Sequence, residues 1–276
     1  MRIRIYHIFL LLLLITGCLP DPLPIDNVPF TEQTVVVGSQ NIPGEFLVIS
    51  VTENFNALEG GTRGDIDSLL LGLLIDSLEL SIEVGGTDYS LTNVQAGLYI
   101  GTGIPKILSE FYTLSFTNPF NNQPVEATSQ LLPFVGFDTV SVSIEETPFD
   151  TLVNVSMRID DEAGPNWYLV NVQLFGEEYE IDDRPYTQLI EDSSFDGEIY
   201  EYEFPVIFRD YEEGDSVFVS MSNISEEYYN FLQLRSDQRF QFLGGLGEPV
   251  TYPSNIENGL GYFHLHVPDV RLFLFE

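Results

Sequence analysis

Residues 83–89 run Glu-Val-Gly-Gly-Thr-Asp-Tyr, and this stretch decides the class of fold that the chain can adopt. The adjacent glycines Gly85 and Gly86 supply the positive φ angles that a tight hairpin turn requires. Short runs suited to strands lie on both sides of the turn. The stretch therefore predicts a β-hairpin.

Similar short runs, alternating or β-branched and separated by Gly, Pro, Asn and Asp, fill most of the chain on both sides of this hairpin. In the first part they predict strands at 34–38, 46–52, 78–84, 89–92, 97–100, 112–117, 125–131 and 139–145. After a turn-rich joint at 146–149 they predict strands at 152–159, 167–175, 199–208, 216–222, 262–267 and 270–275. Strands at this spacing are typical of β-sandwiches. We therefore expect a mainly β protein with two β-sandwich domains, immunoglobulin-like or prealbumin-like, at 33–147 and 148–276, and one or two short helices.

Two segments depart from the strand pattern. Clustered leucines between acidic residues predict a short helix at 66–75, packed on a sheet edge. Ser225 is followed by Glu226 and Glu227, which is typical of a helix start because serine caps the free N–H groups and the helix dipole favours anions there. Tyr228, Phe231, Leu232 and Arg235 then recur at helical spacing. We expect an amphipathic helix near 225–240 that covers one sheet, in preference to a helix that binds a partner.

The first 17 residues are typical of a bacterial lipoprotein signal peptide. Arg2 and Arg4 precede a short apolar run, which ends in small residues before Cys18. Cleavage between Gly17 and Cys18 would make Cys18 the lipidated first residue, and the prolines of residues 18–32 favour an extended tether. Because Cys18 is the only cysteine, we expect neither a disulfide nor a cysteine nucleophile in the mature chain.

The charge of the chain limits the classes of partner. The chain contains 10 Lys and Arg residues and 43 Asp and Glu residues, which gives a net charge of −33. Phosphate backbones repel such a chain, so we expect no nucleic-acid partner and no electrostatic adhesion to anionic lipid. The acid excess either binds cations or keeps an extracytoplasmic surface soluble, and the scatter of the acids along the chain favours the second explanation.

Several motifs along the chain resemble those of a known family. They include Ile-Asp-Asp-Glu-Ala-Gly-Pro-Asn-Trp-Tyr at 159–168 and the closing Pro-Ser-Asn-Ile-Glu-Asn-Gly-Leu-Gly-Tyr-Phe at 253–263. In this order they resemble domain-of-unknown-function 4249, a family of Bacteroidota outer-membrane lipoproteins, over nearly the whole mature chain. The resemblance implies an extracytoplasmic β-rich lipoprotein, held in outer-membrane lipid through Cys18. Asp21 and Asp26, which follow that cysteine, resemble the acidic residues of Bacteroidota lipoproteins that are exported to the cell surface. The family resemblance also implies a binding or accessory role in nutrient uptake beside a TonB-dependent receptor, as such receptors are often encoded next to this family.

The sequence contains no motif that indicates catalysis. It has no Gly-x-Ser-x-Gly elbow, no His-Glu-x-x-His and no phosphate-binding glycine loop, and the family has no assigned catalytic residues. We therefore expect a binding or accessory protein that is not an enzyme, with a ligand that the sequence does not identify. Two alternatives stay open: a structural protein of the envelope, and a hydrolase that uses paired carboxylates such as those at 160–162.

The closing run contains the main candidate site residues. Asn255 and Asn258 can hydrogen-bond the local backbone, while Gly259 and Gly261 permit a sharp turn or a close backbone approach. These residues form either a loop that binds a ligand or partner, or a turn that locks the C-terminal hairpin onto the sandwich. The second role is the more common one for such residues.

Two groups of side chains carry atoms that could bind a metal ion. Alternation places His264 and His266 on one face of a strand, where they could bind zinc or copper if a third ligand were present. A polar strand face beside a buried leucine is the more common explanation for His-Leu-His. Asp160 and Asp161 carry hard oxygen ligands that suit calcium, but they do not match a calcium-binding loop motif. We therefore expect no metal and no cofactor, with calcium as the one candidate.

Overall fold

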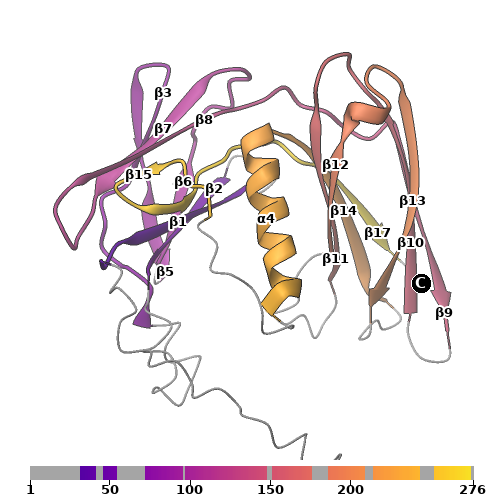
Figure 1. The fold of residues 1–276 in the computed structure, drawn as a ribbon, viewed down its shortest axis with the longest axis horizontal. Coiled ribbons are helices and arrows are strands. Elements are labelled where there is room, and N and C mark those ends of the chain that lie inside the picture. Colours follow the sequence, from indigo (N-terminus) through magenta and orange to yellow (C-terminus); the bar gives the residue numbers. More distant parts are fainter. Residues whose placement is uncertain are drawn as a thin grey trace, which may run out of the picture. The chain divides into compact units, whose positions relative to one another are not determined.

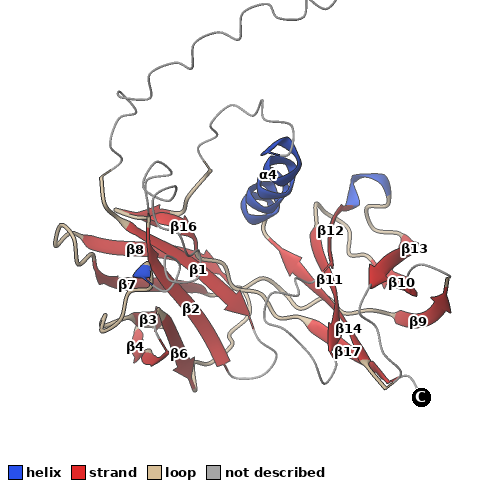
Figure 2. Cartoon of the chain, turned by 90° about the horizontal axis from the view of Figure 1, so that it is seen from below, coloured by secondary structure: helices blue, strands red, loops and turns tan. Residues whose placement is uncertain are grey.

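The computed structural model of the chain describes residues 32–41, 46–54, 72–95, 97–147, 151–175, 186–208, 214–242 and 252–274. The predicted signal peptide, with Gly17 and Cys18, and the predicted tether up to residue 31 lie outside these ranges. The described fold belongs to the compact unit Gln33–Glu276. It confirms a mainly β protein with sheets in a sandwich-like arrangement (Figure 1 and Figure 2).

Two five-stranded sheets enclose the first hydrophobic core. One sheet has the order β16-β1-β2-β6-β5, with bounds Leu260–Tyr262, Val35–Asn41, Phe46–Glu53, Leu98–Thr102 and Thr92–Gln95. The other has the order β15-β8-β7-β3-β4, with bounds Ile256–Glu257, Pro124–Gln130, Phe111–Thr117, Ser81–Val84 and Thr87–Ser90. The hairpin predicted at 83–89 is β3–β4, and Gly85 and Gly86 form its turn with φ angles of 59° and 76°.

Alternation along the strands explains this core. In β7 the side chains of Tyr112, Leu114 and Phe116 are buried, and the residues between them lie on the other face. The buried phenols find partners: the hydroxyl of Tyr112 donates to the carbonyl of Pro105 at 2.6 Å, and that of Tyr99 donates to the carbonyl of Ile75 at 2.7 Å. Burial raises the pKa of both phenols, so they stay protonated donors at neutral pH.

A three-stranded and a four-stranded sheet enclose the second core. The three-stranded sheet has the order β13-β10-β9, with bounds Ile199–Phe208, Thr151–Asp160 and Thr139–Glu146. The four-stranded sheet has the order β12-β11-β14-β17, with bounds Tyr186–Glu191, Trp167–Phe175, Ser216–Ile224 and Asp269–Leu274. A short 3-10 helix, η1 (Asp192–Ser194), follows β12. We expected β9 to be the last strand of the first sandwich, but it pairs with β10 in the second.

The closing run of the sequence lies elsewhere than expected. The strand predicted at 262–267 is wrong: residues 263–268 form no strand, and two short strands precede them. Strand β15 pairs with β8, and β16 runs parallel to β1, so both join the first core. Gly261 permits the close approach of β16 to the backbone of β1. After it, the backbone N–H groups of residues 263–265 donate to side-chain oxygens and not to a neighbouring strand.

The predicted helix near 225–240 is α4, which spans Glu226–Phe242 (Figure 2). Ser225 caps it as expected, since the N–H of Tyr228 donates to the Ser225 hydroxyl at 3.3 Å. Most of the helix predicted at 66–75 lies outside the described residues. In the described part of the chain, no helix has the length and apolar composition to cross a bilayer.

Candidate functional site

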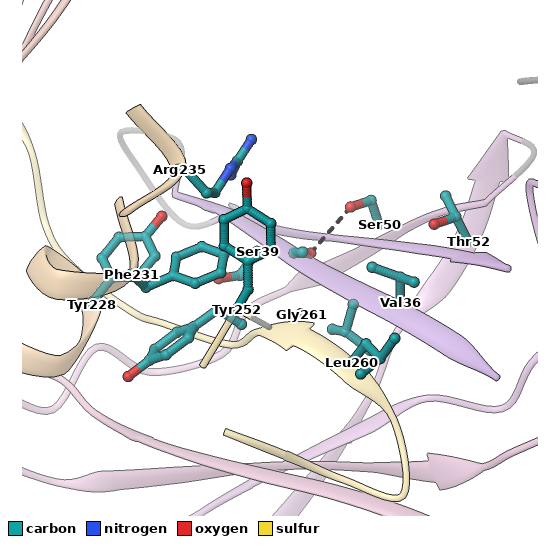
Figure 3. A pocket seen from close by; sticks show the side chains of 13 residues that line it. Val36, Ser39, Ser50, Thr52, Tyr228, Phe231, Arg235, Tyr252, Leu260 and Gly261 are labelled. Carbon is teal, nitrogen blue, oxygen red and sulfur yellow. Dashed lines mark hydrogen bonds between the residues drawn. The ribbon is translucent and has the colours of Figure 1, made fainter. Parts of the chain in front are cut away.

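A groove of about 570 Å³ lies between α4 and the strands β1, β2 and β16 (Figure 3). We call it the aromatic groove. Its described lining residues are Val36, Val37, Gly38, Ser39, Ser50, Thr52, Tyr228, Phe231, Arg235, Tyr252, Leu260, Gly261 and Tyr262. Three segments that are far apart in the sequence therefore build one cavity.

Phe231 is the centre of the aromatic wall of the groove. Its ring centroid lies 5.0 Å from that of Tyr262, 6.0 Å from that of Tyr228 and 6.3 Å from that of Tyr252. Phe231 and Tyr262 are buried, whereas Tyr252 is 41% exposed and forms the rim. Aromatic rings at these separations attract one another, so Phe231 joins the three tyrosines into one apolar wall.

Arg235 is the charged group of the groove. Its Cζ atom lies 5.6 Å from the ring centroid of Phe231, within range of a cation–π interaction. Burial raises the pKa of Tyr228, and the positive charge of Arg235 opposes that shift. Burial, with smaller contributions from Glu227 and Tyr228, raises the pKa of Tyr262 to about 12. Both phenols are therefore neutral donors at physiological pH.

Gly261 lets strand β16 form the floor of the groove. It lies opposite Val37 in the parallel pairing of β16 with β1, and its φ is 98°. A Cβ atom at this position would lie 1.9 Å from the carbonyl oxygen of Val37. Both the backbone conformation and the space therefore require glycine.

The predicted asparagines hold the turn before this strand. The side chain of Asn255 accepts from the N–H of Phe263 at 2.9 Å and donates to its carbonyl at 2.7 Å. Asn258 has a φ of 57°, and its amide donates to the carbonyl of Pro124 at 2.7 Å. Gly259 lies against Ile256. Of the four candidate loop residues, Gly261 lines the groove, while the other three shape the turn.

His264 and His266 lie next to Tyr228, on a segment without strand structure. Their ring centroids are 5.5 Å apart, and the ring of His264 stacks on Tyr228 at 4.3 Å. Burial lowers the pKa of both imidazoles, that of His266 to about 4 with a further contribution from Lys106. Within the described ranges, no third metal-ligating side chain accompanies them. The pair therefore supports α4 as neutral rings.

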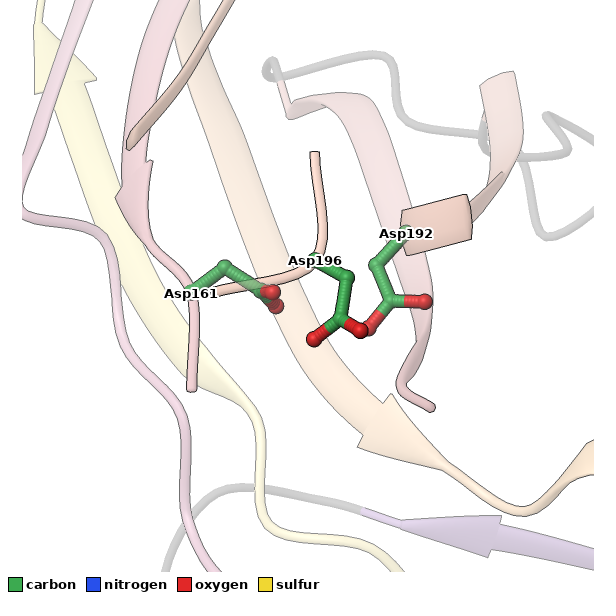
Figure 4. Close-up of side chains that lie close together, drawn as sticks. All are labelled: Asp161, Asp192 and Asp196. Carbon is green, nitrogen blue, oxygen red and sulfur yellow. The ribbon is translucent and has the colours of Figure 1, made fainter. Parts of the chain in front are cut away.

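Three aspartates meet at one end of the second sandwich (Figure 4). Ligand oxygens of Asp161, Asp192 and Asp196 all lie within 4.8 Å of one another, and the first two residues are buried. Burial raises the pKa of Asp192, hydrogen bonds from Asn166 oppose the shift, and the other two carboxylates add to it. Asp160, by contrast, is exposed and is not a member of the cluster.

Hydrogen bonds from neighbouring residues bind all three carboxylates of the aspartate cluster. Asp161 accepts from the N–H of Gly197 at 2.8 Å and from the hydroxyl of Tyr168. The backbone N–H of Asn166 donates to Asp192 at 2.7 Å, and the backbone N–H of Gly164 donates to Asp196 at 2.7 Å. Carboxylate oxygens in such a group suit a hard cation such as calcium, but here they also tie the loop at 161–166 to that at 192–198.

Sequence reasoning missed Asp192 and Asp196 as members of this cluster, and it missed Tyr252 as part of the groove. Neither aspartate belongs to a motif with Asp161, because more than thirty residues separate them from it. The helical spacing of Tyr228, Phe231 and Arg235 was the available signal for one wall of the groove.

Comparisons with known proteins give a family for the chain. A solved structure described as a DUF3823 family protein from Bacteroides ovatus is similar at 14% identity, covering 54% of this chain and 81% of that one, with a TM-score of 0.21. No match was found among curated proteins. A family model described as "Domain of unknown function (DUF4249)" matches residues 21–268. The chain therefore belongs to the domain-of-unknown-function 4249 family, as its motifs indicated.

Proposed function

We propose that this protein binds a small ligand in the aromatic groove and is held by lipid at the outer membrane. The groove itself is the observation that carries the binding role. Its volume of about 570 Å³ falls within the range of small-molecule sites, which are largely apolar with a few placed polar groups. Four aromatic residues and Arg235 provide that combination here.

The lining residues favour binding over catalysis. Among the described residues of the groove, none is Asp, Glu, His or Cys. General acid–base or nucleophilic catalysis commonly depends on such side chains. The polar atoms that remain are hydroxyls, backbone groups and one guanidinium, which can orient a ligand but are poorly suited to proton transfer at neutral pH.

Lipid anchoring and the transporter partner are supported by the sequence. Cys18 follows a lipoprotein-like signal, and the family resemblance implies neighbouring TonB-dependent receptors. An accessory protein tethered beside such a receptor would hold the ligand near the entrance of the transporter. In this account, Cys18 anchors the protein and the aromatic groove captures the ligand.

The binding role is tested by screening the mature protein in detergent against a panel of saccharides and small nutrients, with melting temperature as the readout. A ligand of the groove should stabilise the wild type, and Tyr252→Ala should lose that stabilisation. Tyr186→Ala is the matched control, because Tyr186 is 37% exposed against 41% for Tyr252 and does not line the groove. Equal stabilisation of both variants would contradict binding in the groove.

The accessory role is tested separately by affinity capture of the full-length protein from a solubilised envelope. A TonB-dependent receptor should be recovered with the wild type. If no receptor is captured under conditions that preserve other envelope complexes, the result counts against the partnership with a TonB-dependent receptor. It does not affect the test of ligand binding in the groove.

A further inference from the structure

Arg235 differs from Arg158 and Arg271, the other arginines whose side chains the structure describes. Arg158 forms ion pairs with Asp138 at 2.8 Å and Glu201 at 3.1 Å, and Arg271 pairs with Asp269 at 2.9 Å. Within the described ranges, Arg235 has no ion-pair partner, although the chain contains 43 acidic residues. Its guanidinium lies over an aromatic ring instead.

The position of Arg235 suits a group that approaches from the groove. The residue is exposed and lies on the same face of α4 as Tyr228 and Phe231, about two turns after the first and one turn after the second (Figure 3). Contact with the Phe231 ring restricts the guanidinium but leaves its N–H donors available. A planar guanidinium with available donors matches a carboxylate, which it can bind through two parallel hydrogen bonds.

The remaining lining residues suit a ligand that is apolar on one face and rich in hydroxyls at its edges. Phe231, Tyr252 and Tyr262 offer an apolar wall. On the strand side, the Ser50 hydroxyl donates to the carbonyl of Gly38 at 3.3 Å and keeps acceptor capacity, and Thr52 adds a second hydroxyl. A sugar ring combines a face of C–H groups with a rim of hydroxyls.

From these observations we infer that the ligand of the aromatic groove is an acidic oligosaccharide, with a uronate carboxylate bound by Arg235. The inference rests on the binding function proposed above and names its ligand class. The rings of the groove hold the faces of the sugars, the strand hydroxyls bind the rim, and Arg235 selects the acidic sugar over its neutral counterpart.

The test is isothermal titration of the mature protein with two trisaccharides, one of galacturonic acid and one of galactose, which differ only at C6 of each sugar. At about 0.15 M salt, which screens the net charge of the protein beyond about 8 Å, the wild type should bind the acidic trisaccharide at least about 10-fold more tightly. The reason is that the hydrogen bonds from Arg235 to the carboxylate are charge-assisted and act at short range. Arg235→Gln should lose that preference, whereas Arg235→Lys, which keeps the positive charge, should retain part of it. Arg271→Gln serves as the control, since Arg271 pairs with Asp269 and does not line the groove.

Each of the following results would overturn the inference. Equal binding of the two trisaccharides by the wild type would remove the acidic selectivity. An unchanged preference in Arg235→Gln would remove Arg235 from it. Failure of both trisaccharides to bind would exclude this ligand class. If Tyr252→Ala abolishes binding and Arg235→Gln leaves it unchanged, the groove remains the binding site but Arg235 has no role in it.

Discussion

Replacing Gly261 with alanine tests how the floor of the groove is built. Gly261 lies in β16 opposite Val37 of β1, with a φ of 98°. An added Cβ atom would lie 1.9 Å from the Val37 carbonyl oxygen and 2.8 Å from the Val37 nitrogen. Because both atoms belong to the backbone, no side-chain rotation can relieve the overlap, and β16 has to move away from β1.

The magnitude follows by comparison with Gly103. That residue also has a positive φ, 70°, but a Cβ there would meet nothing within 4 Å. Gly103→Ala therefore adds only backbone strain, about 1–2 kcal/mol. Gly261→Ala adds similar strain and also breaks strand pairing, which brings its cost to about 4 kcal/mol or more. For a protein of this size, each kcal/mol lowers the melting temperature by about 2–4 °C.

The assay is thermal and urea unfolding of the mature protein, followed by circular dichroism. We expect Gly261→Ala to lower the melting temperature by about 8–16 °C, and Gly103→Ala by about 2–8 °C. Because Leu260 and Tyr262 flank the substituted residue and line the groove, the first variant should also lose ligand binding. Equal, small losses of stability in the two variants would refute the close approach of β16 to β1.

Three further predictions concern the groove support, the aspartate cluster and the helix cap. The pKa of His266 is lowered from 6.5 to about 4, so the folded state binds fewer protons than the unfolded state, and the stabilisation present above pH 6.5 is lost as the pH falls toward 4. Between pH 7 and pH 4, the free energy of unfolding measured with urea should fall by up to about 3 kcal/mol more in the wild type than in His266→Gln. Parallel pH profiles of the two proteins would contradict this. Asp192→Asn keeps a carbonyl acceptor for the N–H of Asn166 and removes repulsion from Asp161 and Asp196, so its free energy of unfolding at pH 7 should equal or exceed that of the wild type by up to about 1 kcal/mol. A loss of more than about 2 kcal/mol in that variant, or calcium-dependent stabilisation of the wild type that the variant lacks, would show that the cluster needs its charge. Ser225→Ala removes the cap of α4 and should cost about 1 kcal/mol in the same assay, whereas no change would mean that the bond to Tyr228 contributes nothing.

The local elements of this fold could be predicted from the sequence because each depends on neighbouring residues. The hairpin at Gly85-Gly86 follows from turn geometry, the buried face of β7 from alternation, and the start of α4 from Ser225. These patterns report which side of an element is buried. They do not report which distant element covers it.

The groove and the aspartate cluster depend on pairings between distant segments. The parallel pairing of Val37 with Gly261 joins residues from opposite ends of the chain, so no local pattern contains it. The same applies to Asp161 and Asp192, which only the fold brings together. Sequence reasoning identified Gly261 as a residue that permits close approach, but the strand that it approaches became visible only in the structure.

Mass spectrometry of retained small molecules tests most directly the claim that the aromatic groove holds the natural ligand. The tagged protein is purified from its own envelope without denaturation, and the molecules released on heating are compared between the wild type, Tyr252→Ala and Tyr186→Ala. We expect a compound that the wild type and Tyr186→Ala retain and that Tyr252→Ala lacks. Recovery of the same compounds in equal amounts from all three proteins would contradict the claim.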